Sequence, residues 1–301
     1  MANPILKEKL LAGDPILVAG VWDEISAIIF TKAGFEALKL GSHQTATSLG
    51  LPDLGLVSPK ELREKIFGIT DRTETPLAVD FESGFGGIIN AVYWARQFEK
   101  AGATAIHIDD YGEIDKCPWL PPYLPSLDRA ETVVEKIKAI CDSRRSSNFL
   151  VIARSGAPFS AAFKDDREGG LEEGIRRSVL YKEAGADVIW GRAYSEEGLR
   201  RFRKTIPGPF CTQISARRKE ERTSASHYFT LEQLHEMGYQ LIFTGTALIP
   251  VAIKAMLDSG IEFRKSGDVG VLSDKTMEYN EWNELVGLSQ YLELRKRYSS
   301  E

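Results

Sequence analysis

Joints between a helix and a buried strand recur along this chain, and the clearest reads Glu183-Ala184-Gly185-Ala186-Asp187-Val188-Ile189. Glycine is favoured just past the last turn of a helix because it accepts the left-handed conformation that closes that turn, and here an apolar run starts at once. Similar patterns occur at residues 32–38, 100–106 and 236–242. Each of the four predicts the end of a helix followed directly by a strand.

Apolar runs between these joints predict four more strands, at residues 16–21, 77–80, 149–153 and 210–214. Helical stretches separate them, at residues 59–69, 91–100, 129–140, 171–183 and 195–205 among others. Alternation of this kind requires a parallel sheet, because each helix has to return the chain to the same end of the next strand. We therefore predict an α/β fold with a (βα)8 TIM-type barrel; an open doubly wound sheet is the alternative.

The C-terminal part of the chain exceeds what a barrel needs. We assign residues 1–246 to the barrel and 247–301 to a C-terminal helical extension. The extension is predicted as a helix, a glycine-containing loop at 266–270 and a long amphipathic helix at about 275–298. It would pack on the barrel wall or on a neighbouring subunit, which makes the chain a candidate homo-oligomer, a dimer or tetramer.

Composition excludes several classes of partner. The chain has 301 residues with 43% hydrophobic and 27% charged residues, values that are ordinary for a globular protein. Lys and Arg number 38 against 43 Asp and Glu, for a net charge of −5, and no basic block suggests nucleic acid. The three cysteines, Cys117, Cys141 and Cys211, are odd in number and widely spaced. We expect a reduced, cytoplasmic protein with no membrane span and no signal peptide.

Acidic residues gather at the ends of the third and fourth predicted strands. Asp80 and Glu82 are two residues apart and are expected on one side of the strand, while Asp109 and Asp110 end the next strand. Four carboxylates on adjacent strand ends repel one another unless a cation lies among them. Oxygen ligands of this kind suit Mg²⁺ or Mn²⁺. The alternative is that Glu82 or its neighbour Ser83 caps the following helix.

Other polar residues are expected around the same face of the barrel. Lys116 and Cys117 lie in a long proline-rich loop, where a neighbouring cation stabilises the thiolate of a cysteine that serves as an acid in its thiol form or as a nucleophile in its thiolate form. The alternative is that Cys117 is an inert packing residue. Arg154 ends the fifth strand and would bind a substrate carboxylate or pair with an acidic ligand. His43 follows the second strand, and His107 is expected to point away from the neighbours of Asp109.

Ordered motifs occur along nearly the whole chain. They are Gly20-Val21-Trp22-Asp23-Glu24-Ile25-Ser26-Ala27, Ser48-Leu49-Gly50-Leu51-Pro52-Asp53-Leu54-Gly55, Asp80-Phe81-Glu82-Ser83-Gly84-Phe85-Gly86, Ile108-Asp109-Asp110, Lys116-Cys117 and Ile152-Ala153-Arg154. In this order they resemble the motifs of the isocitrate lyase and phosphoenolpyruvate mutase superfamily. The resemblance is strongest to short members of the methylisocitrate lyase or carboxyphosphoenolpyruvate mutase kind.

This resemblance implies a set of roles. Mg²⁺ would be held by Asp80, Glu82 and Asp109, partly through water. A small carboxylic acid with a 2-oxo or 2-hydroxy group would chelate the metal, and Cys117, beside Lys116, would protonate the departing carbanion. Members commonly form tetramers by exchanging a C-terminal helix, which suits the extension. The residues expected at the substrate are Trp22, Gly41, Ser42, His43, Asp53 and Arg154.

Departures from the family motifs leave the substrate open. Family lyases usually carry Lys-Lys/Arg-Cys-Gly-His in the loop, where this chain has Asp115-Lys116-Cys117-Pro118-Trp119. The usual Asp-x-Asp is here Asp80-x-Glu82, and the usual Ala-Arg-Thr-Asp-Ala has Ser155 and Gly156 in place of Thr and Asp. A different sequence, residues 213–218, also follows the seventh strand.

We therefore predict an Mg²⁺-dependent carbon–carbon lyase that cleaves a 2-hydroxy or 2-oxo di- or tricarboxylate-like acid and releases a 2-oxo acid. Two alternatives use the enolate of pyruvate without the cysteine: phosphonomutase or phosphonate hydrolase chemistry, and decarboxylation of an oxaloacetate-like acid. A third alternative, of a different class, is a degenerate barrel that binds a metabolite without catalysis.

The role of Cys117 gives a first prediction. Cys117→Ser should lower turnover about a hundredfold or more, because general acid catalysis contributes on that order. Binding of Mg²⁺ should hardly change, since the thiol is not an expected ligand. Steady-state kinetics and a metal titration check this, with Cys141→Ser as the matched control. Full activity in Cys117→Ser would reject the acid role.

Overall fold

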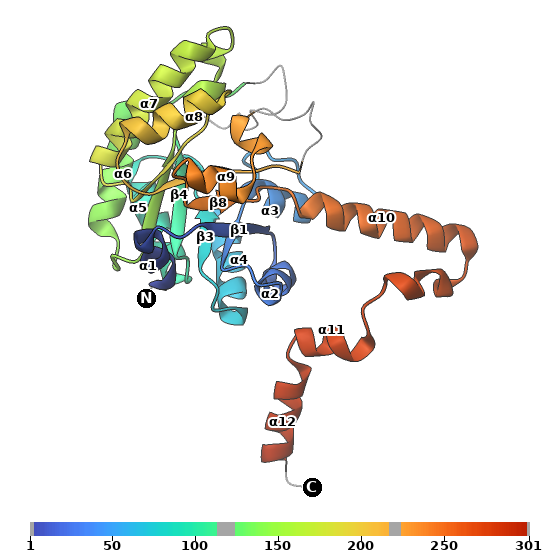
Figure 1. Ribbon diagram of the computed structural model, residues 1–301. Helices are drawn as coiled ribbons and strands as arrows, with labels where there is room; N and C mark the ends of the chain where they lie inside the picture. The colour runs from blue at the N-terminus through green and yellow to red at the C-terminus, as the bar shows by residue number, and fades with distance from the viewer. Residues whose placement is uncertain (1–2, 113–123, 217–223, 300–301) are drawn as a thin grey trace.

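The computed structural model describes residues 3–112, 124–216 and 224–299. It is a closed barrel of eight parallel strands in sequence order (Figure 1). The predicted (βα)8 barrel is confirmed, and the open sheet is wrong, because the first strand pairs with the last and places Val18 beside Phe243. The strands are β1 (Ile16–Val21), β2 (Ala37–Leu40), β3 (Leu77–Asp80), β4 (Ala105–Asp109), β5 (Leu150–Arg154), β6 (Val188–Trp190), β7 (Phe210–Gln213) and β8 (Leu241–Phe243).

The four glycine joints have the conformation that the sequence predicts. Gly34, Gly102, Gly185 and Gly238 have φ values of 91°, 104°, 107° and 90°, and β2, β4, β6 and β8 begin three residues later. The helices of the barrel region are α1 (Ile5–Ala12), α2 (Glu24–Lys32), α3 (Ser42–Ser48), α4 (Pro59–Arg72), α5 (Ile88–Lys100), α6 (Ala130–Ser143), α7 (Arg167–Glu183), α8 (Glu196–Thr205) and α9 (Leu231–Glu236).

Buried apolar side chains form two separate cores. The larger core lies between the strands and the surrounding helices and includes Phe81, Phe98 and Ile137. The smaller one fills the inside of the barrel, where Trp190 stacks on Phe243 with ring centroids 4.8 Å apart. Leu6 and Leu10 of α1 belong to this inner core, so α1 closes the amino-terminal end of the barrel. The polar residues that face inward lie at the opposite end of the barrel, where the strands have their carboxyl ends.

The C-terminal extension leaves the barrel as α10 (Ile249–Ser266), which projects away from it (Figure 1). The predicted long helix at 275–298 is wrong in one respect: it is two helices, α11 (Tyr279–Leu285) and α12 (Leu288–Tyr298). Gly287, with φ of 82°, separates them because a left-handed residue cannot continue a helix. The extension exposes large apolar side chains, among them Val251, Met256, Leu257, Trp282 and Leu292.

Within the described residues, every helix is too short or too polar to pass through a lipid bilayer.

Candidate active site

Neighbouring strand ends bring opposite charges together inside the barrel. Asp109 of β4 lies in register with Arg154 of β5, and Asp80 of β3 with His107 of β4. Arg154 Nη2 contacts Asp109 Oδ2, and His107 Nε2 lies 2.7 Å from Asp109 Oδ1. His107 Nδ1 lies 3.7 Å from Asp80 Oδ1. The expectation that His107 points away is wrong, because residues two apart on a strand face the same side.

Burial and pairing fix the charges of this cluster. Burial lowers the pKa of His107 to about 4, against the opposing effect of Asp109. Burial acts to raise the pKa of Asp109, but Arg154 and His107 more than offset it, so this pKa lies below its usual value. Burial also opposes the charge on Arg154, yet Asp109 holds the pKa of the guanidinium above its usual value. A neutral imidazole therefore lies beside an ionised carboxylate and a guanidinium.

A small cavity of about 80 Å³ opens above this cluster at the carboxyl end of the strands. Ser42 Oγ donates a hydrogen bond of 3.2 Å to Asp80 Oδ2, and His43 Nδ1 lies 3.6 Å from Asp53 Oδ2. The structure thus brings most of the predicted substrate residues and one predicted metal ligand around a single cavity. These lining residues are Gly41, Ser42, His43, Asp53, Asp80 and Arg154.

The other two predicted metal ligands, Glu82 and Asp109, line an adjacent cavity of about 850 Å³. β3 ends at Asp80, and Glu82 has a φ of 54°, so the alternation of the strand does not extend to Glu82. Its backbone N–H still donates to Asp80 Oδ1 at 3.3 Å. In the described ranges, no three His, Cys, Asp or Glu side chains converge as a ready metal cluster. Tyr111 lines both cavities and separates them.

The remaining predicted site residues are Trp22, Lys116 and Cys117. Trp22 follows β1 and packs edge-on against Phe30 of α2, with ring centroids 6.0 Å apart, and it is not among the described residues that line the two cavities. Lys116 and Cys117 lie outside the described residues. Their predicted roles therefore stay predictions.

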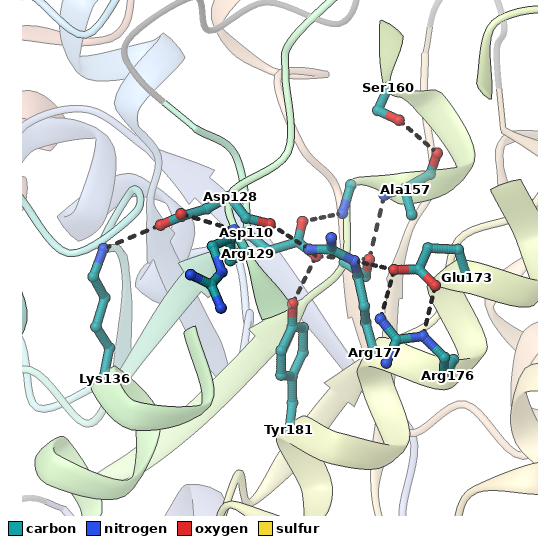
Figure 2. A network of polar contacts seen from close by, with 12 residues as sticks. Asp110, Asp128, Arg129, Lys136, Ala157, Ser160, Glu173, Arg176, Arg177 and Tyr181 are labelled. Atoms are coloured by element: carbon teal, nitrogen blue, oxygen red, sulfur yellow. Dashed lines mark hydrogen bonds and ion pairs between the residues drawn. The ribbon is translucent and has the colours of Figure 1, made fainter. Parts of the chain in front are cut away.

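Asp110, the fourth carboxylate of the sequence cluster, faces away from the barrel interior (Figure 2). It accepts hydrogen bonds from Gly156 N at 2.6 Å, Ser155 Oγ at 2.8 Å and Tyr181 Oη at 2.8 Å, and it pairs with Arg177 Nη1 at 3.2 Å. Because β4 alternates, Asp109 and Asp110 have to face opposite sides. Asp110 is thus a structural anchor between β4, β5 and α7. Only three of the four carboxylates, Asp80, Glu82 and Asp109, remain as candidates for the metal site.

Gly156 stands where the family usually carries Asp, and the structure gives a physical reason. A Cβ atom at this position would lie 2.0 Å from Cε1 of the Tyr111 ring. The ring of Tyr111 occupies that space, and Arg192 Nη1 donates to Tyr111 Oη at 3.2 Å. The glycine therefore permits an aromatic side chain at the boundary between the two cavities.

Two cations of the small cavity were missed by the sequence analysis, Lys39 and Arg192. Both are buried, and burial lowers the pKa of each from its ordinary value. A signal for Lys39 is present in the sequence, because a charged residue interrupts the apolar strand Ala37–Leu40. Arg192 follows β6 by two residues, at the strand end where functional residues of a barrel gather.

A barrel with a charged cavity at the carboxyl end of its strands has the arrangement of a (βα)8 enzyme. Residues 6–263 match the phosphoenolpyruvate phosphomutase family, and the chain belongs to that family. The resemblance seen in the sequence is thereby confirmed, together with the expectation of an enzyme of the phosphoenolpyruvate mutase/isocitrate lyase superfamily.

Similar proteins include lyases and mutases. The chain is 29% identical over 298 residues to 2,3-dimethylmalate lyase of Eubacterium barkeri, covering 98% of this chain and 97% of that protein. It is 31% identical over 290 residues to 2-methylisocitrate lyase of Aeropyrum pernix, covering 95% and 88%. A crystal structure of 2,3-dimethylmalate lyase has a TM-score of 0.85 at 26% identity, covering 100% and 97% of the two chains.

The buried imidazole gives a second prediction. The pKa of His107 is about 4 in the folded chain against about 6.5 when unfolded, so the unfolded state binds more protons between these values. This histidine contributes stability that is fully present above pH 6.5 and is lost as pH falls to 4, by about 3 kcal/mol. In His107→Gln the loss of unfolding free energy between pH 7 and 4 should shrink by about that amount.

Urea unfolding at a series of pH values measures this difference. His235→Gln on α9 removes an imidazole outside the barrel interior and is the matched control. Equal pH dependence in His107→Gln and the native chain would contradict a neutral, buried His107.

Proposed function

We propose that the chain is a divalent-metal-dependent carbon–carbon lyase that cleaves a 2-hydroxy or 2-oxo di- or tricarboxylate-like acid and releases a 2-oxo acid. The observation that carries this proposal is the convergence of Asp80, Arg154 and Arg192 on one small cavity at the carboxyl end of the barrel. An anionic metal ligand beside two guanidinium groups suits an acid bound through both a metal and its carboxylates. The lyases of dimethylmalate and methylisocitrate among the relatives support it.

The donor set fits a hard divalent cation. Asp80 lines the small cavity and offers the carboxylate oxygens that Mg²⁺ and Mn²⁺ prefer, while Glu82 and Asp109, the other two proposed ligands, line the adjacent cavity. Asp80 is buried yet faces the cavity. A crystal structure of phosphonopyruvate hydrolase with oxalate and Mg²⁺ has a TM-score of 0.85 to this fold. When bound, the metal would polarise the oxygen on carbon 2 of the acid.

The protein side chains would orient the acid and handle its protons. Arg154, held by Asp109, presents its guanidinium to a substrate carboxylate. Ser42 fixes the Asp80 carboxylate by its hydrogen bond, and His43 with Asp53 lies at the rim. Cys117 would give a proton to the carbanion of the second fragment, with Lys116 beside it in sequence.

An assay of metal-dependent cleavage tests the function and gives a third prediction. With Mg²⁺ or Mn²⁺, alkyl-substituted malates and 2-methylisocitrate should yield a 2-oxo acid, detected by coupled reduction. Asp80→Asn should lower kcat/KM about a hundredfold or more, because a charged ligand of the metal is lost. Asp71→Asn on the exposed face of α4 is the matched control.

Each alternative chemistry has its own product. Conversion of phosphonopyruvate, with pyruvate and phosphate or phosphoenolpyruvate formed, would replace the lyase by a hydrolase or mutase. Carbon dioxide release from oxaloacetate would replace it by a decarboxylase. Failure of the full chain to turn over any of these acids would favour the non-catalytic barrel.

We propose further that residues 247–301 form an extension which packs on another copy of the chain, in a dimer or tetramer. Met256 and Leu257 of α10 are 68% and 58% exposed. Neighbouring apolar side chains exposed in this way are typical of a protein–protein contact. Among the described residues, Cys141 and Cys211 are free thiols, which supports a reducing, cytoplasmic setting for this assembly.

The extension gives a fourth prediction. Replacing Met256 and Leu257 by Asp should shift the full chain from oligomer toward monomer, because charge is placed in an apolar contact. Light scattering after gel filtration measures the mass. Lys254→Glu, a charge change on the same exposed helix, should leave the assembly intact. A monomeric native chain would refute the proposed packing.

A further inference from the structure

Lys39 is held in the centre of the barrel by two aromatic rings. Its ammonium Nζ lies 4.7 Å from the ring centre of Trp190 and 5.1 Å from that of Phe243. The side chain is 8% exposed, and it lines the small cavity. Rings that face an ammonium attract it and fix its position, so Lys39 is a cation built into the floor of the site.

The polar contacts of Lys39 are long. Its Nζ lies 3.9 Å from Asp80 Oδ2 and 3.4 Å from Nδ1 of His107. Neither distance is that of a short charge-assisted hydrogen bond. The ammonium thus shares a carboxylate with the proposed metal and keeps donor capacity toward the cavity.

Charged side chains of both signs surround the proposed metal site before any ligand binds. Lys39, Arg154 and Arg192 line the small cavity with Asp53 and Asp80, and the other two proposed metal ligands, Glu82 and Asp109, line the adjacent cavity. A divalent ion then adds two positive charges, and a doubly charged acid offsets them. Loss of the ammonium of Lys39 would make the site more negative by one charge for the metal alone. The positive charge on Lys39 therefore weakens the binding of the metal alone and strengthens the binding of the anionic acid.

We propose that Lys39 couples the binding of the divalent metal to the binding of a dianionic 2-oxo acid. The ammonium opposes the metal alone at their shared carboxylate, Asp80, and it supplies positive charge to the acid once both ligands are present. This inference rests on the proposed metal-dependent function. It assigns Lys39 as a substrate-specificity residue that favours a dianion over a monoanion.

The test compares metal and oxalate binding in the full chain by calorimetry. In Lys39→Met, which keeps an apolar stem between the two rings, Mn²⁺ alone should bind about tenfold more tightly. Oxalate in saturating Mn²⁺ should bind about tenfold or more weakly, whereas the monoanion pyruvate should change less. Lys182→Met on α7, where Nζ donates to the carbonyls of Ala186 and Asp187, is the control that removes one partly buried lysine away from the cavity.

Lys39→Arg separates charge from packing. It keeps the positive charge, so it should retain the weak metal binding and the preference for oxalate. Equal affinities in Lys39→Met and the native chain, or a change of both ligands in the same direction, would overturn the coupling while leaving the lyase intact. A native chain that binds neither Mn²⁺ nor oxalate would overturn the proposed function as well.

Discussion

The buried ion pair between Asp109 and Arg154 organises the carboxyl end of this barrel. Two charges removed from water are tolerated only when each is closely paired, and breaking such a pair costs about 3–5 kcal/mol. Arg154 binds one oxygen of Asp109, and the neutral ring of His107 lies at the other. Asp109 is thereby held inside the barrel, whereas Asp80 lines the small cavity. The register of β3, β4 and β5 sets this arrangement, so fold and site follow from one set of backbone pairings.

Local rules were enough to predict the barrel from the sequence. The four left-handed glycines and the apolar runs fix where helices end and strands begin, and the strand ends then identify Asp80, Asp109 and Arg154. Side-chain direction beyond a strand end was less predictable. Glu82 follows β3 in a left-handed conformation, which no alternation describes. The break at Gly287 in the predicted C-terminal helix was missed because the amphipathic pattern continues across it. In each case a single residue of unusual backbone geometry overrides periodicity.

Residues that lie far apart in the sequence contact one another around Tyr111 and Asp110. Gly156 leaves space for the ring of Tyr111, whose hydroxyl contacts Arg192. Asp110 holds Gly156 and Ser155 from the other side and ties them to Tyr181 and Arg177 of α7 (Figure 2). The departures from the usual family motif after β5 are thus one coordinated change that reaches the cavity wall. A distance of more than forty residues separates these partners in sequence, which is why local patterns did not reveal them.

The short helix α1 limits the ways in which a ligand can enter and leave the barrel. Leu6 and Leu10 close the amino-terminal end of the barrel, where apolar side chains fill the inner core. A molecule in the central space therefore has one exit. Cleavage turns one occupant into two, and both fragments have to depart by the entrance that admitted their parent.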